Sequence, residues 1–205
     1  MKHSYLRVLI ASALLLLFSV AVFAQDQEVE EEVTYANPEI LVDTEWVLEN
    51  LDNEEVVFIQ LSSVDDYLAG HIPGARQSSV AALNNPDDEI TGQIGTPEQA
   101  AEALGNLGIT TDTIIVLYDG SNNLSAARAY WVLKYYQHED VRIYNGGLIR
   151  WLLDGQELAT EPVEFEATEY EIAEADPEIR TTGEYILERL NDDDVQLGDT
   201  RGINE

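Results

Sequence analysis

Short, nearly uninterrupted apolar runs set the fold class of this chain. The clearest, residues 113–118 (TIIVLY), is rich in β-branched side chains, and residues 56–61 (VVFIQL) form a similar run. A strand of this composition is typical of a parallel sheet that is covered on both faces, because neither face of the strand needs to be polar. The sequence therefore predicts buried parallel strands rather than an all-helical fold.

Helical patterns separate these strands, and capping residues mark where the helices begin. Thr96-Pro97-Glu98-Gln99 combines a capping threonine, a proline in the first turn and a glutamine three residues on. Strands that alternate with helices at this spacing indicate an open α/β sheet with helices on both faces. Other helix starts are expected at Asp43 or Thr44, Ser63, Ser125 and Leu148, with a further strand at 141–144.

The first 24 residues have the features of a secretory signal peptide. Basic residues precede an apolar stretch at 8–23, and Ala24 offers a cleavage site before Gln25. The stretch is shorter than the ~20 residues that span a bilayer, so cleavage is favoured over a membrane anchor. We therefore expect an exported protein, periplasmic or extracellular, in which residues 25–39 form an acidic tether and residues 25–32 have no regular structure.

Charge and cysteine content exclude several functions. The chain carries 40 acidic and 10 basic residues, a formal net charge of −30, so it lacks the basic patch that nucleic-acid binding needs. It has no cysteine, which removes disulfides, thiolate metal sites and a cysteine nucleophile. His71 and His138 are far apart and alone do not make a metal site. We therefore expect no nucleic acid, no metal and no cofactor.

An internal repeat appears at an offset of 139 residues. Residues 45–51 (EWVLENL) lead into Val56, and residues 184–190 (EYILERL) lead into Val195 without a gap. The segment between the copies, residues 161–176, is acidic and mostly unpatterned, as an interdomain linker would be. The predicted organisation is thus one domain at 40–160, the linker, and the start of a second domain at 177–205 that ends after its first strand.

Four motifs follow one another along the chain, namely GHIPGA (70–75), IIVLYDGSNN (114–123), SAARAYWVLKYY (125–136) and HEDVRIYNGGLIRW (138–151). In this order they resemble the rhodanese family of sulfurtransferases in its exported two-domain form. The resemblance implies an open parallel sheet of about five strands between helices, and transfer of sulfane sulfur by a cysteine that opens the loop after the central strand. Backbone N–H groups at a helix N-terminus would stabilise its thiolate and persulfide.

Asp119 stands where the resemblance places the cysteine, in the loop Asp119, Gly120, Ser121, Asn122 and Asn123. Family members with two domains keep a non-catalytic first domain, and this loop resembles that half. Arg201 matches the substrate-facing arginine of an Asp-x-Arg motif in the second copy, whereas residues 60–62 (QLS) depart from that motif in the first. The resemblance thus implies a first domain that is inactive alone and packs on a second, catalytic domain, whose active loop would lie beyond residue 205. A small sulfur-containing anion would be the donor for the full-length protein.

One alternative function stays open, and a second is weaker. The chain is either that non-catalytic domain or a stand-alone module that uses the loop to hold an anion or a protein partner. The weaker idea makes Asp119 a nucleophile, but a carboxylate does not hold sulfane sulfur as a stable persulfide does.

Several side chains are interpreted as structural rather than functional. We expect Arg128 to pair with Asp119 rather than to bind an anion. Asp119 and Asp154 would suggest a pair of acids, but one lies at a strand end and the other at a helix end, so we expect any proximity between them to be chance. His71 is expected to hold its turn by local hydrogen bonds, and His138 to be solvated. The aromatic residues expected in the core or at a domain interface are Trp131, Tyr135 and Tyr136.

Overall fold

A computed structural model describes residues 36–200 of the chain. The predicted signal peptide, most of the predicted tether and Arg201 lie outside the described residues. Among residues 36–200, no helix combines the length and the apolar composition needed to cross a membrane.

Within residues 36–200, five strands form one sheet in the order β1-β5-β4-β2-β3, and every neighbouring pair is parallel. The two longest strands are the apolar runs of the sequence and lie side by side in full register, from Val56 opposite Ile114 to Leu61 opposite Asp119. The predicted open parallel sheet is therefore confirmed. The strands are β1 (Leu41–Val42), β2 (Val56–Leu61), β3 (Arg76–Ser78), β4 (Ile114–Asp119) and β5 (Val141–Tyr144).

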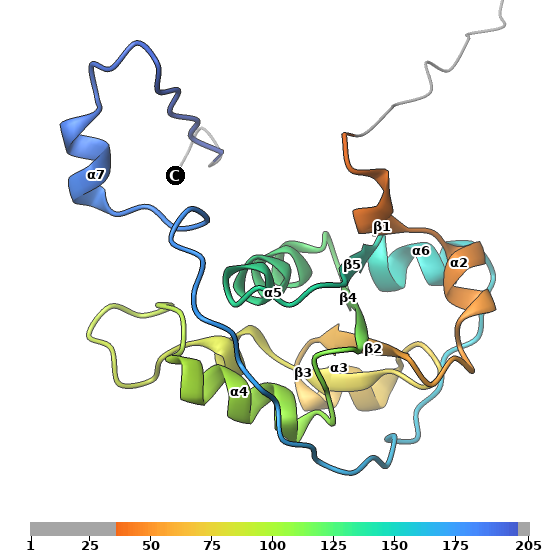
Figure 1. The fold of residues 1–205 in the computed structure, drawn as a ribbon. Helices are drawn as coiled ribbons and strands as arrows, with labels where there is room; N and C mark the ends of the chain where they lie inside the picture. The colour runs from red at the N-terminus through yellow and green to blue at the C-terminus, as the bar shows by residue number, and fades with distance from the viewer. Residues whose placement is uncertain (1–35, 201–205) are drawn as a thin grey trace, which may run out of the picture. The chain divides into compact units, whose positions relative to one another are not determined.

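Helices cover both faces of this sheet (Figure 1). Helices α4 and α5 supply buried residues to the core on one face, and α2 and α6 supply them on the other. The α-helices are α2 (Thr44–Glu49), α3 (Val64–Ala69), α4 (Pro97–Asn106), α5 (Leu124–Tyr135), α6 (Gly147–Leu153) and α7 (Gly183–Glu188), with 3₁₀ turns η1 (Pro38–Ile40) and η2 (Val80–Leu83).

The central strand β4 shows how one apolar run serves two cores. Ile115 and Leu117 enter the cluster under α4 and α5, whereas Val116 and Tyr118 enter the cluster under α2 and α6. All four side chains are at most 1% exposed. Successive side chains of a strand point to opposite faces, so a strand buried on both sides must be apolar at every position.

Most predicted helix starts agree with the structure, but the start of α5 does not. Asp43, Ser63 and Thr96 cap their helices through side-chain oxygens, and Thr96 forms a complete capping box with Gln99. Ser125 was expected to cap α5, but that helix begins at Leu124. The Ser125 N–H instead donates to Asp119 Oδ2 at 2.9 Å, because a carboxylate from the end of β4 takes over the capping function.

The acidic segment 161–176 is attached to the domain along α4 and α5 (Figure 1). The Thr168 N–H donates to the Gly105 carbonyl, and the Asp176 N–H donates to the Tyr135 carbonyl. Tyr170 is 9% exposed and belongs to the core cluster on this face. A side chain at Gly105 would meet the Thr168 carbonyl oxygen at 2.5 Å, so the glycine permits this close approach.

His138 contradicts the expectation that it is solvated. It is 2% exposed, and its ring lies against that of Tyr170. Its Nε2 is 2.8 Å from the Thr113 carbonyl oxygen and its Nδ1 is 2.7 Å from the Tyr170 hydroxyl. Burial is the main cause that lowers the pKa of His138 below its ordinary value. The error arose because the segment that covers the ring comes more than 30 residues later in the chain.

The second copy of the repeat has the same local structure as the first. Helix α7 has the bounds of α2 shifted by 139 residues, and Thr182 caps it through Tyr185 N–H as Asp43 caps α2 through Trp46 N–H. The N–H of Val195 donates to the Asp192 carbonyl, as that of Val56 does to Asn53. Residues 195–200 form no strand, although their counterpart is β2. A helix capped by its own residues forms locally, whereas a strand needs a neighbour.

Candidate functional site

The candidate site lies where the strand order reverses. After β2 the chain adds β3 on one side, and β4 then returns to the other side of β2. In open α/β sheets ligands bind outside the carboxyl ends of the strands at such a point. A cavity of about 510 Å³ lies here. It is lined by Gln60, Leu61, Ser62, Asp66, Ala69, Gly70, Asp119, Gly120, Ser121, Ser125, Leu148 and Leu158.

Asp119 ends β4 and occupies the donors of the loop that follows it. Its Oδ1 accepts the N–H groups of Ser121 at 2.8 Å and Asn123 at 2.9 Å, and its Oδ2 accepts that of Ser125 at 2.9 Å. The side chain is 3% exposed. The converging N–H groups and the N-terminus of α5 make an anion-binding site, and the carboxylate of Asp119 is the anion that occupies it.

The Asn145-Gly146-Gly147 turn and Asn123 hold the loop after Asp119 in place. Asn123 adopts a left-handed conformation, donates from Nδ2 to the Tyr144 carbonyl at 2.7 Å and accepts the Asp119 N–H at 3.2 Å. Gly147 has φ +55°, and a Cβ there would lie 2.6 Å from the Asp119 carbonyl oxygen. Only glycine allows α6 to start this close to the loop, which explains the glycine at position 147.

Arg128 does not pair with Asp119, contrary to the sequence-based expectation. Its Nη2 donates to the Gly92 carbonyl at 2.7 Å, and its guanidinium lies over the Trp131 ring. Three backbone N–H groups already satisfy Asp119, so a distant guanidinium gains little there. Asp154, as expected, has other partners. Each basic side chain in residues 36–200 contacts another group of the chain, namely those of Arg76, Arg128, Lys134, Arg142, Arg150, Arg180 and Arg189.

His71 holds the turn after α3 and does not line the cavity. It is fully buried, its Nδ1 is 2.9 Å from the Tyr67 carbonyl oxygen, and its ring stacks on that of Tyr67. The Tyr118 hydroxyl accepts the Ile72 N–H at 3.0 Å, and burial raises the pKa of Tyr118. These contacts fix the GHIPGA motif against the sheet, as expected for a structural histidine.

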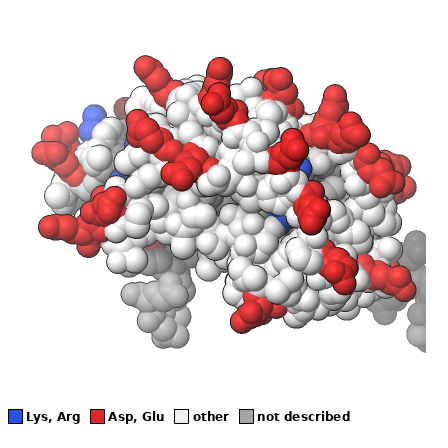
Figure 2. All heavy atoms as spheres, turned by 90° about the horizontal axis from the view of Figure 1, so that it is seen from below, with Lys and Arg blue, Asp and Glu red and all other residues white. Residues whose placement is uncertain are grey.

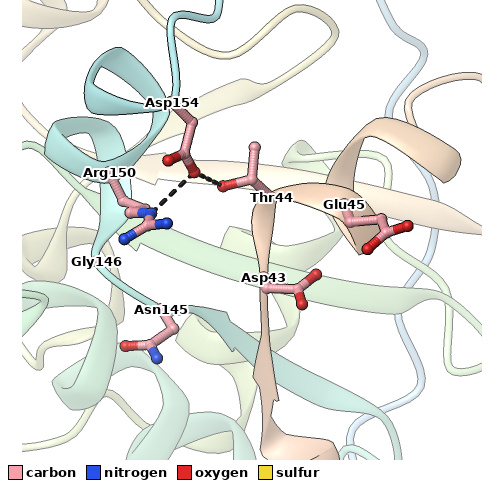
Figure 3. Close-up of a pocket in the computed structure, with 7 residues that line it drawn as sticks. All are labelled: Asp43, Thr44, Glu45, Asn145, Gly146, Arg150 and Asp154. Carbon is pink, nitrogen blue, oxygen red and sulfur yellow. Dashed lines mark hydrogen bonds and ion pairs between the residues drawn. The ribbon is translucent and has the colours of Figure 1, made fainter. Parts of the chain in front are cut away.

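A second cavity, of about 550 Å³, lies near the end of β5 (Figure 3). The sequence analysis did not predict this cavity, although the sequence has Arg150 and Asp154 four residues apart, the spacing of an ion pair along a helix. Asp154 accepts hydrogen bonds from Thr44 and from Arg150 Nε, and these bonds lower its pKa. The Asp43 carboxylate caps α2. Within residues 36–200 no group of three or more His, Cys, Asp or Glu side chains is arranged to hold a metal ion.

Acidic side chains are distributed over the face of the molecule shown in Figure 2, and basic ones are few there. A dianionic sulfur donor would therefore approach against the field of the surface and meet the carboxylates of Asp66 and Asp119 at the first cavity. The arrangement disfavours binding of such a donor to this part of the chain.

The fold and the loop define an α/β domain with an anion cradle after its central strand. The sequence model of the rhodanese-like domain family matches residues 43–154. The chain therefore belongs to the rhodanese family, as its motifs indicated.

Curated relatives carry sulfur-transfer names. The chain is 36% identical over 157 residues to the sulfur carrier protein TtuD of Thermus thermophilus, which covers 76% of this chain and 54% of that protein. It is 35% identical over 168 residues to a protein of Saccharopolyspora erythraea named "Putative thiosulfate sulfurtransferase", covering 82% of this chain and 58% of that one. The chain thus spans little more than half the length of these relatives.

Solved structures show the same fold. The 3-mercaptopyruvate sulfurtransferase SseA of Escherichia coli has a TM-score of 0.66 and 30% identity, over 73% of this chain and 61% of that chain. An anaerobic ergothioneine biosynthesis enzyme of Chlorobium limicola has a TM-score of 0.63 and 30% identity, over 78% of this chain and 43% of its own.

Proposed function

We propose that residues 40–160 are the non-catalytic first rhodanese domain of an exported sulfurtransferase of the thiosulfate type. Sulfane sulfur would travel as a persulfide on a cysteine beyond residue 205, in a second domain that begins at residue 177. The observation that carries the proposal is the position of the Asp119 carboxylate, which accepts the three N–H groups that would otherwise face a persulfide.

The chemistry of sulfur transfer explains why this loop is suited to structure rather than to catalysis. The nucleophile must attack sulfane sulfur, hold it covalently and release it to an acceptor, and a stabilised thiolate does all three. The chain has no cysteine. The carboxylate of Asp119 instead completes hydrogen bonds that keep the loop and the start of α5 in place.

Two findings support a second domain that packs on the first. The repeat of sequence is also a repeat of local structure, from the cap of α7 to the turn at Asp192. The relatives are nearly twice as long as the part that this chain matches. Apolar side chains exposed on α6 would be covered by such a domain, namely Ile149, Leu152 and Leu153. Export to the periplasm or the extracellular space is part of the proposal and rests on residues 1–24.

The test is a cyanide-to-thiocyanate assay on the purified chain, with mass spectrometry for a persulfide. We expect no turnover above a heat-denatured control. An Asp119→Cys variant is expected to show at most weak activity, because the N–H groups of the loop are positioned to donate to a carboxylate rather than to a persulfide. Turnover by the unmodified chain would refute the proposal.

The coding sequence beyond residue 205 separates the two candidate functions. A further domain with a cysteine after its central strand supports the proposed one. A stop codon at that point would favour a stand-alone binding module instead.

A further inference from the structure

The cavity beside the Asp119 loop has a charge opposite to that of an anion site. Its lining includes the carboxylates of Asp66 and Asp119, and none of its lining residues is Lys, Arg or His. The N–H groups at the start of α5 that would attract an anion already donate to Asp119. The lining therefore carries two acidic residues and no basic one.

Gln60 supplies a buried acceptor in this cavity. The residue is 1% exposed and lines the cavity at the end of β2. Its Nε2 donates to Ser62 Oγ at 3.2 Å, and Ser62 Oγ donates to the Ser63 carbonyl. The Oε1 atom accepts no hydrogen bond from any described group. A buried acceptor without a donor is costly, and a ligand that supplies the donor removes that cost.

The rest of the lining is suited to a cation with an apolar stem. Asp66 is an exposed residue in the first turn of α3, and its Oδ2 accepts a hydrogen bond from Ser63 Oγ. Leu148, Leu158 and Ala69 provide apolar surface in the same cavity. A guanidinium carries several donors in one plane and keeps its charge at all relevant pH values, while its stem packs on apolar side chains.

We propose that this cavity binds a guanidinium group on a short aliphatic stem, with Gln60 Oε1 as its buried acceptor and Asp66 as its charge partner. The proposal goes beyond the proposed function, because it holds whether or not a second domain follows and whether or not sulfur is transferred. The group belongs either to a small molecule or to an arginine side chain of a protein partner.

The experiment is an NMR titration of the ¹⁵N-labelled full chain with ethylguanidinium, with its neutral isostere ethylurea and with thiosulfate. Saturable shifts at the amides of Ser62 and Ser121 are expected with ethylguanidinium. We expect ethylurea to bind about fivefold more weakly, since one charge pair near the surface separates the two ligands. Thiosulfate is expected not to shift these amides.

Variants test the two named contacts. Gln60→Met is expected to weaken ethylguanidinium binding about tenfold, because a hydrogen bond to a charged group is lost. Asp66→Asn is expected to weaken it about threefold. Asp65→Asn is the matched control, since Asp65 lies in the same first turn of α3 but does not line the cavity, and it should leave binding unchanged.

Equal binding of ethylurea, a thiosulfate shift at the same amides, or equal effects of the two aspartate variants would overturn the proposal. The absence of any saturable shift would do the same. A capped Gly-Arg-Gly peptide separates the sources. Tighter binding than ethylguanidinium indicates a protein side chain, whereas equal or weaker binding indicates a small molecule, and either result supports the site.

Discussion

Replacement of Asp119 by alanine should destabilise the domain strongly. The carboxylate accepts three backbone N–H groups at 2.8 to 2.9 Å and is 3% exposed. Ser121 is exposed, so water replaces the carboxylate there, whereas Asn123 and Ser125 are half-buried. Hydrogen bonds to a charged group contribute roughly 1.5–3 kcal/mol each, so two of them give a loss of about 3–6 kcal/mol. That loss is a large share of the roughly 5–15 kcal/mol that stabilises a domain.

Urea denaturation followed by tryptophan fluorescence measures this loss as a shift of the midpoint at constant slope. Asp119→Asn keeps one acceptor oxygen and should lose only about 1.5–3 kcal/mol, chiefly at the Ser125 N–H. Asp112→Ala is the control, because Asp112 is an exposed carboxylate in the turn before β4, and it should change the free energy of unfolding by less than about 0.5 kcal/mol. If Asp119→Ala behaves like the control, the loop does not depend on the carboxylate and the reasoning is wrong.

Three further perturbations test other parts of the structure. Burial lowers the pKa of His138, so the histidine binds a proton more readily in the unfolded chain than in the folded one. The free energy of unfolding should therefore fall as the pH drops below the ordinary histidine pKa, by up to about 1.4 kcal/mol per pH unit. His138→Gln should remove this slope between about pH 7.5 and about pH 5.5 in paired urea titrations, and an unchanged slope would exclude the histidine as its source. Gly147→Ala should cost about 1–3 kcal/mol more than Gly155→Ala in thermal melts, because a Cβ at Gly147 meets the Asp119 carbonyl while Gly155 has open space; equal costs would contradict the close packing. In limited proteolysis with mass spectrometry, the first cuts should fall within 177–200, and Tyr170→Ala should move them into 161–176; an unchanged pattern would show that Tyr170 does not hold that segment.

The site shows how far the sequence leads and where it stops. The sequence predicted a central strand at 113–118 and a loop at 119–123, whereas the structure extends the strand to Asp119 and begins α5 at Leu124. The motifs did not indicate that the carboxylate takes over the cap of α5, nor that Gln60 is a buried acceptor beside it. The first depends on the path of the loop in space, and the second on the meeting of α3, α6 and two strand ends in one cavity.

What the sequence alone determined is local or periodic. Caps such as Thr96 with Gln99 act over three residues, and the apolar run of β4 reports burial on both faces wherever the strand lies. The conformation of α7 repeats that of α2 for the same reason, since each helix is capped by its own residues.

Only the tertiary structure decided the partners that are distant in the chain. His138 reads as a polar loop residue until Tyr170 covers it, 32 residues later, and Arg128 finds the Gly92 carbonyl 36 residues earlier rather than Asp119. The acidic segment 161–176 has no pattern of its own, because its contacts are fixed by the surface of α4 and α5. Contacts of this kind depend on which surfaces the fold brings together, and short-range sequence patterns carry no record of them.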